Sequence, residues 1–454
     1  MEFHHLFSFY LTIITLTTIS LFHSSKAVNP IILPIFKDTT KPQYYTTFLL
    51  GTPSLSVSLA IDLSSPWSWF TCNLVGFNDT WYSGVPNSST YRVQRCTDDN
   101  SCAVYDSNYC YTCNSPNCKP KGNMCTGEIY PPSLYTGGSF YGGHLLAPLL
   151  LDIITVYKSN GPIPLGKRVY GFSFGCTGVD DLKGLSRYTK GVLSLARKDS
   201  NSFHGFITKA FKIPNKFALC LPSASKSTLN GAMYFGGGPY KLPPSKLDLS
   251  QFFVKTALVV NPIDVGETYG KRNSSIEYFV NIKSILVDDT PLKINSSLLV
   301  IDKNGLGGTK INPIYPYTTL HTNIYNALVD AFTTKAATMN ITRVGQVSSF
   351  SACFSSKNMV GTKTGPKVPI ISLKLDGRNE DIWRFYGFNS MIKVSNDVRC
   401  LAIVDGGLSV KASIVIGGKQ MEDSLVEFDL ESSKLRVMSS LLRFGTSCSQ
   451  FRGA

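Results

Sequence analysis

The stretch Ser58-Leu59-Ala60-Ile61-Asp62-Leu63-Ser64-Ser65-Pro66-Trp67-Ser68-Trp69 decides how the rest of this 454-residue chain is interpreted. Its first part is an apolar run typical of a buried strand, and the run leads into a loop that carries a single carboxylate, Asp62. A carboxylate at such a place is a candidate for acid–base chemistry. One carboxylate cannot act as acid and base by turns without a partner that shares its proton. The sequence must therefore contain a second loop of the same kind if this chemistry is intact.

The second loop of this kind is damaged. Two-lobed aspartic proteases present each half of their catalytic pair as an apolar strand that ends in Asp-x-Ser or Asp-x-Gly. The matching segment here is Leu298-Leu299-Val300-Ile301-Asp302-Lys303-Asn304-Gly305-Leu306-Gly307-Gly308-Thr309, in which Leu306 and Gly307 stand where the carboxylate should be. In the first loop, two Ser residues replace the small Gly that lets the backbone approach the catalytic pair. We therefore expect the shape of an aspartic protease without its catalysis, with the aspartate of the first loop vestigial.

The length and the start of the chain predict a leader and two lobes. Leu6–Phe22 is apolar and small residues follow it, which is typical of a secretory signal peptide. The remaining residues, about 427, exceed one ordinary domain. The predicted fold is all-β with few short helices, the bilobal pepsin-like acid-protease fold. We expect a signal peptide at 1–27, an N-terminal lobe with a Cys-rich insertion at 28–240, and a C-terminal lobe at 241–454.

Other features agree with a secreted protein. No stop-transfer flank follows the leader, and the later apolar run Leu145–Val156 is interrupted by Pro148 and Asp152, so we expect no membrane span. We expect an extracellular monomer of the cell wall space. Five glycosylation sequons point the same way, at Asn78, Asn87, Asn273, Asn295 and Asn340.

The formal net charge of +14 bears on the partner. Nucleic acid is the first partner that such a charge suggests. No stretch holds a basic cluster interleaved with aromatic residues, however, and secretion argues against nucleic acid as well. The spread charge suits attraction to an acidic protein or adhesion to acidic wall polymers, and a merely solvated surface is the other interpretation.

Twelve cysteines indicate an oxidising compartment. Seven of them fall within residues 72–125, a polar segment that cannot bury a core of its own and must be held by covalent bridges. Cys110-x-x-Cys113 with two later cysteines has a spacing that zinc allows. No His lies nearby, so we expect disulfides, with no metal and no cofactor. Cys353 and Cys400 should pair, which leaves Cys448 to reach back to the first half. The predicted disulfide set is Cys72, Cys96, Cys102, Cys110, Cys113, Cys118, Cys125, Cys176, Cys220, Cys353, Cys400 and Cys448.

Local patterns elsewhere distinguish strands from helices. Gly171-Phe172-Ser173-Phe174-Gly175 matches the nucleophile elbow of serine hydrolases, but alternation continues through it and a loop follows, so we expect a plain strand. Gly191–Arg197 and Ile414–Gly418 are apolar strands, one downstream of each loop, which is the order that two related lobes would show. The best helix signal is Thr322–Ala337, which we expect to be capped by its own first residue.

Several segments resemble one group of plant proteins. The group consists of secreted pepsin-like proteins that have lost activity: extracellular dermal glycoproteins, endoglucanase and xylanase inhibitors, and legume basic globulins. The resemblance covers essentially the whole mature chain and is closest to the dermal-glycoprotein and endoglucanase-inhibitor branch. Its most specific parts are residues 307–311, 316–320, 324–325, 340–344, 350–353, 383–384, 389–391 and 414–423.

The resemblance implies a bilobal fold with six disulfides and a role in binding microbial glycoside hydrolases, particularly xyloglucan-degrading endoglucanases. The cleft of such an enzyme holds two carboxylates, and an inserted Arg or Lys can pair with both. We expect Arg343, in Asn340-Ile341-Thr342-Arg343, to make this contact, and Lys419 is the second candidate. The chain departs from the group where Ser194-Leu195-Ala196-Arg197 replaces Gly-Leu-Gly-Arg, which bears on the inherited target.

Two other functions remain open from the sequence. One is a weakly active aspartic endopeptidase that uses Asp62 with another partner. The other is a globulin that binds a peptide or a wall polymer and has no enzyme target. Pepstatin-sensitive cleavage of peptides at acid pH distinguishes the first, and binding to a panel of hydrolases distinguishes the second from an inhibitor.

Overall fold

A computed structural model describes residues 30–38, 40–71, 88–96, 102, 109–113, 122–130, 145–157, 166–197, 202–223, 230–264, 274–377 and 381–450. The predicted signal peptide at 1–27 lies outside these residues. So do Cys72, Cys118 and the sequons at Asn78, Asn87 and Asn273. Within the described residues, no helix is long and apolar enough to cross a membrane.

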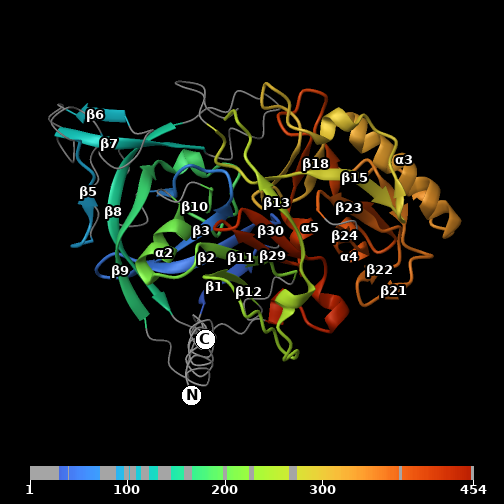
Figure 1. Cartoon of the computed structure of the whole chain (residues 1–454), viewed down its shortest axis with the longest axis horizontal. Coiled ribbons are helices and arrows are strands. Elements are labelled where there is room, and N and C mark those ends of the chain that lie inside the picture. The colour runs from blue at the N-terminus through green and yellow to red at the C-terminus, as the bar shows by residue number, and fades with distance from the viewer. Residues whose placement is uncertain are drawn as a thin grey trace, which may run out of the picture.

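Strands dominate the described residues (Figure 1). The first half holds β1 (Ile31–Lys37), β2 (Tyr44–Leu50), β3 (Leu55–Asp62), β4 (Trp69–Thr71), β5 (Arg92–Val93), β6 (Tyr109–Cys113), β7 (Gly122–Ile129), β8 (Leu145–Tyr157), β9 (Gly166–Thr177), β10 (Gly191–Ser194), β11 (Lys216–Cys220) and β12 (Gly231–Phe235). The second half holds β13 (Val254–Val259), β14 (Phe279–Val280), β15 (Ile282–Val287), β16 (Thr290–Pro291), β17 (Thr309–Ile311), β18 (Thr318–Leu320), β19 (Arg343–Val344), β20 (Cys353–Ser355), β21 (Gly361–Thr362), β22 (Gly365–Pro366), β23 (Ile371–Leu375), β24 (Ile382–Phe385), β25 (Met391–Lys393), β26 (Val398–Leu401), β27 (Ile403–Asp405), β28 (Ile414–Ile416), β29 (Leu425–Asp429) and β30 (Lys434–Met438). The helices are η3 (Val179–Leu182), α2 (Phe203–Phe211), η4 (Leu249–Phe252), η5 (Ser296–Leu299), α3 (Thr322–Thr338), α4 (Gly387–Ser390), α5 (Gly418–Met421), η6 (Leu441–Phe444) and η7 (Cys448–Gln450).

One antiparallel sheet joins the two halves at the centre of the molecule (Figure 1). Its strands follow the order β1, β12, β11, β29, β30, β13, so each half supplies three neighbouring strands. Where β11 meets β29, Phe217 lies opposite Phe428 and their rings stack with centroids 4.7 Å apart. Tyr278 packs edge-on against Phe428 at 4.7 Å. The apolar core therefore continues from one half into the other through this sheet.

Each half repeats one strand arrangement. In the first half β3 lies between antiparallel β2 and parallel β10, and β4 pairs with β10 and β9. In the second half β17 lies between antiparallel β14 and parallel β28, and β18 pairs with β28 and β27. Every pair keeps the same direction in both halves. The fold is thus the predicted one, all-β and pepsin-like, with a repeated unit around each loop.

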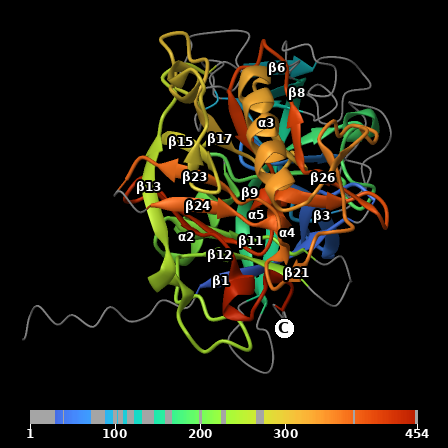
Figure 2. The same cartoon turned by 90° about the vertical axis from the view of Figure 1, so that its right-hand side faces the viewer.

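The helix and strand predictions can be compared with these elements. The Gly171–Gly175 motif lies inside strand β9, as predicted, and Ser173 accepts a hydrogen bond from Gln94. The helix predicted at 322–337 is α3, which runs along the outside of the second half (Figure 2). Its cap is His321, whose Nδ1 accepts from the Asn323 N–H at 3.2 Å, so the predicted capping by the first helical residue is wrong.

Helix α2 was not predicted. Ser202 caps it by accepting from the Gly205 N–H, and five of its nine residues are buried. This helix packs Phe203 and Ile207 into the core of the first half. Most of its residues are Phe, Ile, Thr and Gly, which do not favour a helix, so the Ser202 cap was the main signal in the sequence.

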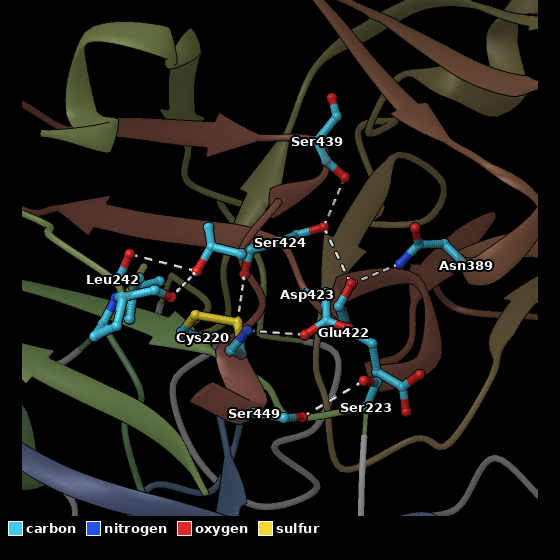
Figure 3. The surroundings of a disulfide bond; sticks show 12 residues. Cys220, Ser223, Leu242, Asn389, Glu422, Asp423, Ser424, Ser439 and Ser449 are labelled. Atoms are coloured by element: carbon cyan, nitrogen blue, oxygen red, sulfur yellow. Dashed lines mark hydrogen bonds between the residues drawn. A yellow bond between two sulfur atoms is a disulfide. The ribbon is translucent and has the colours of Figure 1, made fainter. Parts of the chain in front are cut away.

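Disulfides connect distant parts of the chain. The predicted pairing of Cys353 with Cys400 is confirmed, and Cys448 reaches back to Cys220 in the first half, as predicted (Figure 3). Two of the four cysteines of the zinc alternative are also bonded, since Cys110 pairs with Cys96 and Cys125 with Cys102. Cys176 is disulfide-bonded too. Among the described cysteines none is free.

Candidate functional site

Asp62 is the last residue of β3, and its side chain is 1 % exposed. The strand is held on both sides, with Asp62 opposite Ser194 of the parallel strand β10. The N–H of Leu195 donates to the carbonyl of Asp62 at 2.8 Å. The strand-then-carboxylate arrangement predicted from the sequence is therefore present, with the carboxylate at the end of a fixed strand.

The register identifies the counterpart of Asp62 in the second half. Ile61 lies opposite Leu193 in the parallel pair of the first half, and Ile311 lies opposite Ile416 in the parallel pair of the second half. The residue after Ile61 is Asp62, and the residue after Ile311 is Asn312. Asn312 therefore occupies the position equivalent to Asp62.

Hydrogen bonds around the two positions support this equivalence. Ser68 follows Asp62 by six residues, and Thr318 follows Asn312 by six. The Oγ of Ser68 accepts from the N–H of Ser194 at 3.0 Å, and the Oγ1 of Thr318 accepts from the N–H of Gly417 at 3.1 Å. A side-chain hydroxyl thus accepts a backbone hydrogen bond at the end of the equivalent strand in each half, β10 in the first and β28 in the second.

Asn312 binds directly to Asp62. Its Nδ2 donates to Asp62 Oδ1 at 2.6 Å and to Ser64 Oγ at 2.9 Å. Its Oδ1 accepts from the N–H groups of Leu63 at 3.3 Å and Ile314 at 3.1 Å. Because both ends of the amide are engaged, its orientation is fixed by the network.

Ser64 completes the surroundings of the carboxylate. Its N–H and its Oγ both donate to Asp62 Oδ1, at 2.9 and 2.8 Å. The Ser in the loop, which departs from the usual Gly, therefore supplies a hydrogen bond that a Gly cannot. Three donors converge on one carboxylate oxygen in a buried place.

Leu306 and Gly307 do not occupy the second position, and this prediction is wrong. They lie in a tight turn before β17, where Asp302 Oδ1 accepts from the N–H groups of Asn304 and Leu306, each at 2.8 Å. Gly307 has φ of +92° and bridges to Ile301. The Gly-Gly-Thr sequence led to the wrong alignment of this turn with the first loop. The signal for the correct position was a pair of similar dipeptides, Ile61-Asp62 at the end of β3 and Ile311-Asn312 at the end of β17.

Charged groups surround the Asp62–Asn312 pair. Burial raises the pKa of Asp62, and hydrogen bonds from Asn312 and Ser64 and the charge of Lys310 oppose this rise. Lys310 itself is paired with Glu277, with Nζ and Oε1 2.6 Å apart. Although burial lowers the pKa of Lys310, the nearby Glu277, Tyr315 and Asp62 raise it above its usual value. The carboxylate therefore lies against a neutral amide and near the Lys310–Glu277 ion pair.

The two predicted contact residues differ in their surroundings. Arg343 begins β19 and is exposed, and its single hydrogen bond in the described part of the chain is a long one to the carbonyl of Ser351 at 3.4 Å. Lys419 is 14 % exposed, forms an ion pair with Glu422 at 2.6 Å, and lies 4.2 Å from the centre of the Phe388 ring. Its ammonium group therefore already has a partner within the protein, and its use as a contact stays a prediction. Of the two, only Arg343 offers its charged group to a partner.

Two of the five predicted glycosylation sites belong to the described residues. Asn295 and Asn340 are both exposed. Asn295 Oδ1 accepts from the N–H of Ser297 at 3.0 Å at the start of η5. Asn340 follows α3, has φ of +57°, and lies three residues before Arg343. Both side chains are accessible to modification.

Family models match most of the chain. "Xylanase inhibitor N-terminal" matches residues 44–237, and "Xylanase inhibitor C-terminal" matches residues 277–439. The chain belongs to the xylanase-inhibitor family. Its relatives in this family include "Probable aspartic proteinase GIP2" of Nicotiana benthamiana, 39 % identical over 423 residues, which covers 93 % of this chain and 91 % of the relative. "Probable aspartic proteinase GIP1" of Glycine max is 33 % identical and covers 93 % and 92 %.

Solved structures of this xylanase-inhibitor family share the fold. "Crystal structure of edgp" superposes with a TM-score of 0.84 at 34 % identity, over 93 % of this chain and 98 % of that one. A conglutin gamma described as a basic 7S globulin from lupine seeds superposes with a TM-score of 0.75 at 26 % identity, over 94 % and 99 %. The family resemblance expected from the sequence is thus confirmed, and its members carry the names of both proteinases and seed globulins.

Proposed function

We propose that this protein is a secreted, proteolytically inactive aspartic-protease-like protein that binds and inhibits microbial cell-wall-degrading glycoside hydrolases of the endoglucanase class. The observation that carries the proposal is the 2.6 Å hydrogen bond from the Asn312 amide to the Asp62 carboxylate. Membership of the xylanase-inhibitor family supports binding of glycoside hydrolases in general. The choice of a xyloglucan-degrading endoglucanase as target is our own.

Proteolysis by this fold requires two carboxylates that share one proton. An amide neither takes up nor releases a proton in the working range, so Asn312 cannot alternate with Asp62 as acid and base. The Nδ2 of Asn312 also occupies a hydrogen-bonding direction of Asp62 Oδ1 that a catalytic water needs. On this reasoning Asp62 is vestigial, and the fold serves binding.

Arg343 is the proposed inhibitory contact. Its guanidinium group is exposed and carries five N–H donors. A retaining glycoside hydrolase holds two carboxyl groups about 5 Å apart, which a single guanidinium can contact together. A charge pair that loses its water in this way contributes strongly to affinity, whereas the surrounding positive charge chiefly speeds encounter.

We propose the following for the processing, location and modification of the protein. The mature protein begins near Val28, acts in the cell wall space as a monomer, and carries glycans at Asn295 and Asn340. Its two lobes divide near residue 240. Mass spectrometry of the protein secreted by plant cells measures the first residue, the glycans and the oligomeric state together.

The test is an inhibition assay with a purified fungal xyloglucan-specific endoglucanase. We expect wild-type protein to inhibit it, Arg343→Ala to raise the inhibition constant about tenfold or more, and added salt to slow association. Lys357→Ala is the matched control, because Lys357 is an exposed cation of the same half and its loss changes net charge equally. Equal inhibition by wild type and Arg343→Ala would remove Arg343 from the proposal.

A second assay tests the absence of proteolysis. Purified protein is incubated with denatured haemoglobin between pH 3 and pH 6, with and without pepstatin. We expect no cleavage above that of a mock purification. Pepstatin-sensitive cleavage that is lost in Asp62→Ala would show that the protein is an endopeptidase.

A further inference from the structure

Three aromatic rings and one guanidinium group form a column on the first half. Phe36 of β1 stacks on Tyr45 of β2 with centroids 5.4 Å apart, and Tyr45 stacks on Tyr188 at 6.0 Å. The guanidinium carbon of Arg187 lies 4.9 Å from the centre of the Tyr188 ring. Its Nη2 also donates to the Tyr188 hydroxyl at 2.8 Å. Arg187 and Tyr188 are both exposed, although their side chains are held in place.

Buried residues fix the loop on both sides of this dipeptide. Before it, Ser186 is 2 % exposed and donates through Oγ to Asp38 Oδ2 at 2.6 Å. After it, Thr189 is 2 % exposed, and both its N–H, at 3.0 Å, and its Oγ1, at 2.8 Å, donate to the Ser186 carbonyl. The N–H of Tyr188 donates to Ser186 Oγ at 3.2 Å. The exposed pair therefore stands on a rigid turn, so little freedom is lost when a partner binds it.

The column lies beside the candidate site. Tyr45 pairs with Ala60, so both side chains point to one face of the sheet, and Asp62, two residues after Ala60, shares that face. At about 3.3 Å per residue and about 4.8 Å between strands, the backbone of Tyr45 lies about 8 Å from that of Asp62. The aromatic column therefore lies on the same face of the sheet as Asp62, whose own side chain is buried.

The charge of Arg187 is available to a partner. Among the described residues, no carboxylate lies within ion-pair distance of its guanidinium group. The other exposed cation of this loop, Lys183, lies 3.6 Å from Asp180 and so has a partner. A linear acidic polymer requires cations in a row, whereas one fixed guanidinium beside one fixed phenol suits a single carboxylate on a protein surface. Arg and Tyr are also among the residues that most often dominate the energy of protein interfaces.

We propose that Arg187 and Tyr188 form a preorganised contact for an acidic side chain on the surface of the inhibited hydrolase. This inference rests on the proposed function, and it assigns a second contact, on the half of the molecule that does not carry Arg343. The carboxylate pairs with the guanidinium group, which the ring and the hydroxyl of Tyr188 hold in place.

The test measures association and dissociation rates with the immobilised fungal xyloglucanase. The variants are Arg187→Gln, Arg187→Lys and Tyr188→Leu, with Lys183→Gln as the matched control that removes one exposed charge from the same loop. We expect Arg187→Gln to weaken binding about tenfold, mainly through faster dissociation. Arg187→Lys should weaken it about threefold or more, because Lys loses the stacked, two-pronged geometry. Lys183→Gln should change it less than twofold.

The outcomes separate this inference from the proposed function. If wild type binds the hydrolase and Arg187→Gln binds equally well, the second contact is refuted and the proposed function stands. If wild type does not bind at all, the proposed function fails, and the contact fails with it. An oligogalacturonate that binds wild type but not Arg187→Gln, with hydrolase binding unchanged, assigns the residue to a polymer and overturns the protein partner. The thermal unfolding midpoint of each variant is compared with that of wild type. Equal midpoints show that a change in binding does not come from a loss of folding.

Discussion

Asp423→Asn tests whether a buried carboxyl group sets the pH dependence of stability. Asp423 follows α5 and is 1 % exposed, and its Oδ1 accepts from the N–H of Cys448 at 2.9 Å, beside the disulfide to Cys220 (Figure 3). The adjacent Glu422 pairs with Lys37 at 2.5 Å and with Lys419 at 2.6 Å, so Asp423 has no cation of its own in this cluster. The amide of Asn keeps an oxygen for the Cys448 N–H but cannot titrate.

The magnitude follows from the pKa of Asp423. Burial raises this pKa from 3.8 to about 6, and hydrogen bonds from the Ser223 side chain and the Cys448 N–H and the charge of Lys419 only partly oppose the effect. Between these two values the unfolded chain has lost the proton while the folded chain keeps it, so stability falls as the pH rises. At about 1.4 kcal/mol per pH unit, and with the unfolded group already partly ionised at pH 4, this group should remove about 2 kcal/mol between pH 4 and pH 7.

The assay is urea unfolding of the disulfide-intact protein at pH 4, 5, 6 and 7. As the pH rises from 4 to 7, we expect the unfolding free energy of Asp423→Asn to increase by about 2 kcal/mol relative to that of wild type. Asp397→Asn is the control, because Asp397 is an exposed carboxylate in the turn between β25 and β26. A constant difference between Asp423→Asn and wild type across this range, or a shift of opposite sign, refutes the reasoning.

Three further predictions concern the site and the core. Asn312→Asp places a second buried carboxylate against Asp62, so one of the two must stay protonated, and we expect a loss of about 3 kcal/mol at pH 7 relative to pH 4 in urea unfolding. Cys220→Ser with Cys448→Ser opens a loop closed over 228 residues and should lower the unfolding free energy by about 5 kcal/mol, read from the same assay. Phe428→Ala removes a fully buried ring from the sheet that joins the halves and should cost about 4 kcal/mol, read from the urea midpoint, whereas Phe428→Leu should cost less than half as much.

The sequence predicts the parts of this fold that depend on local pattern. The strand that ends in Asp62, the strand through Ser173 and the helix at 322–337 all follow from periodicity, because a buried face repeats within a few residues. The equivalence of Asp62 and Asn312 depends on which strands pair and in what register. Asp62 and Asn312 are 250 residues apart, so no local pattern shows that they are equivalent. The Gly-Gly-Thr sequence at 307–309 therefore led to a wrong prediction of the second position.

The repeated register also explains why one substitution would not recreate a protease. Ala60 lies opposite Val192 in the first half, and its equivalent, Lys310, lies opposite Val415 in the second. Lys310 therefore shares a face with Asn312, as Ala60 does with Asp62. In a working enzyme the proton shared by two carboxylates relieves their repulsion, whereas here an amide binds Asp62 directly and Lys310, which is paired with Glu277, adds a positive charge nearby. Asn312→Asp alone leaves Lys310 near the pair, where its charge weakens the hold of the two carboxyl groups on the proton that they share. By this argument, restored proteolysis requires Lys310→Ala together with Asn312→Asp, and the single variants should both remain inactive.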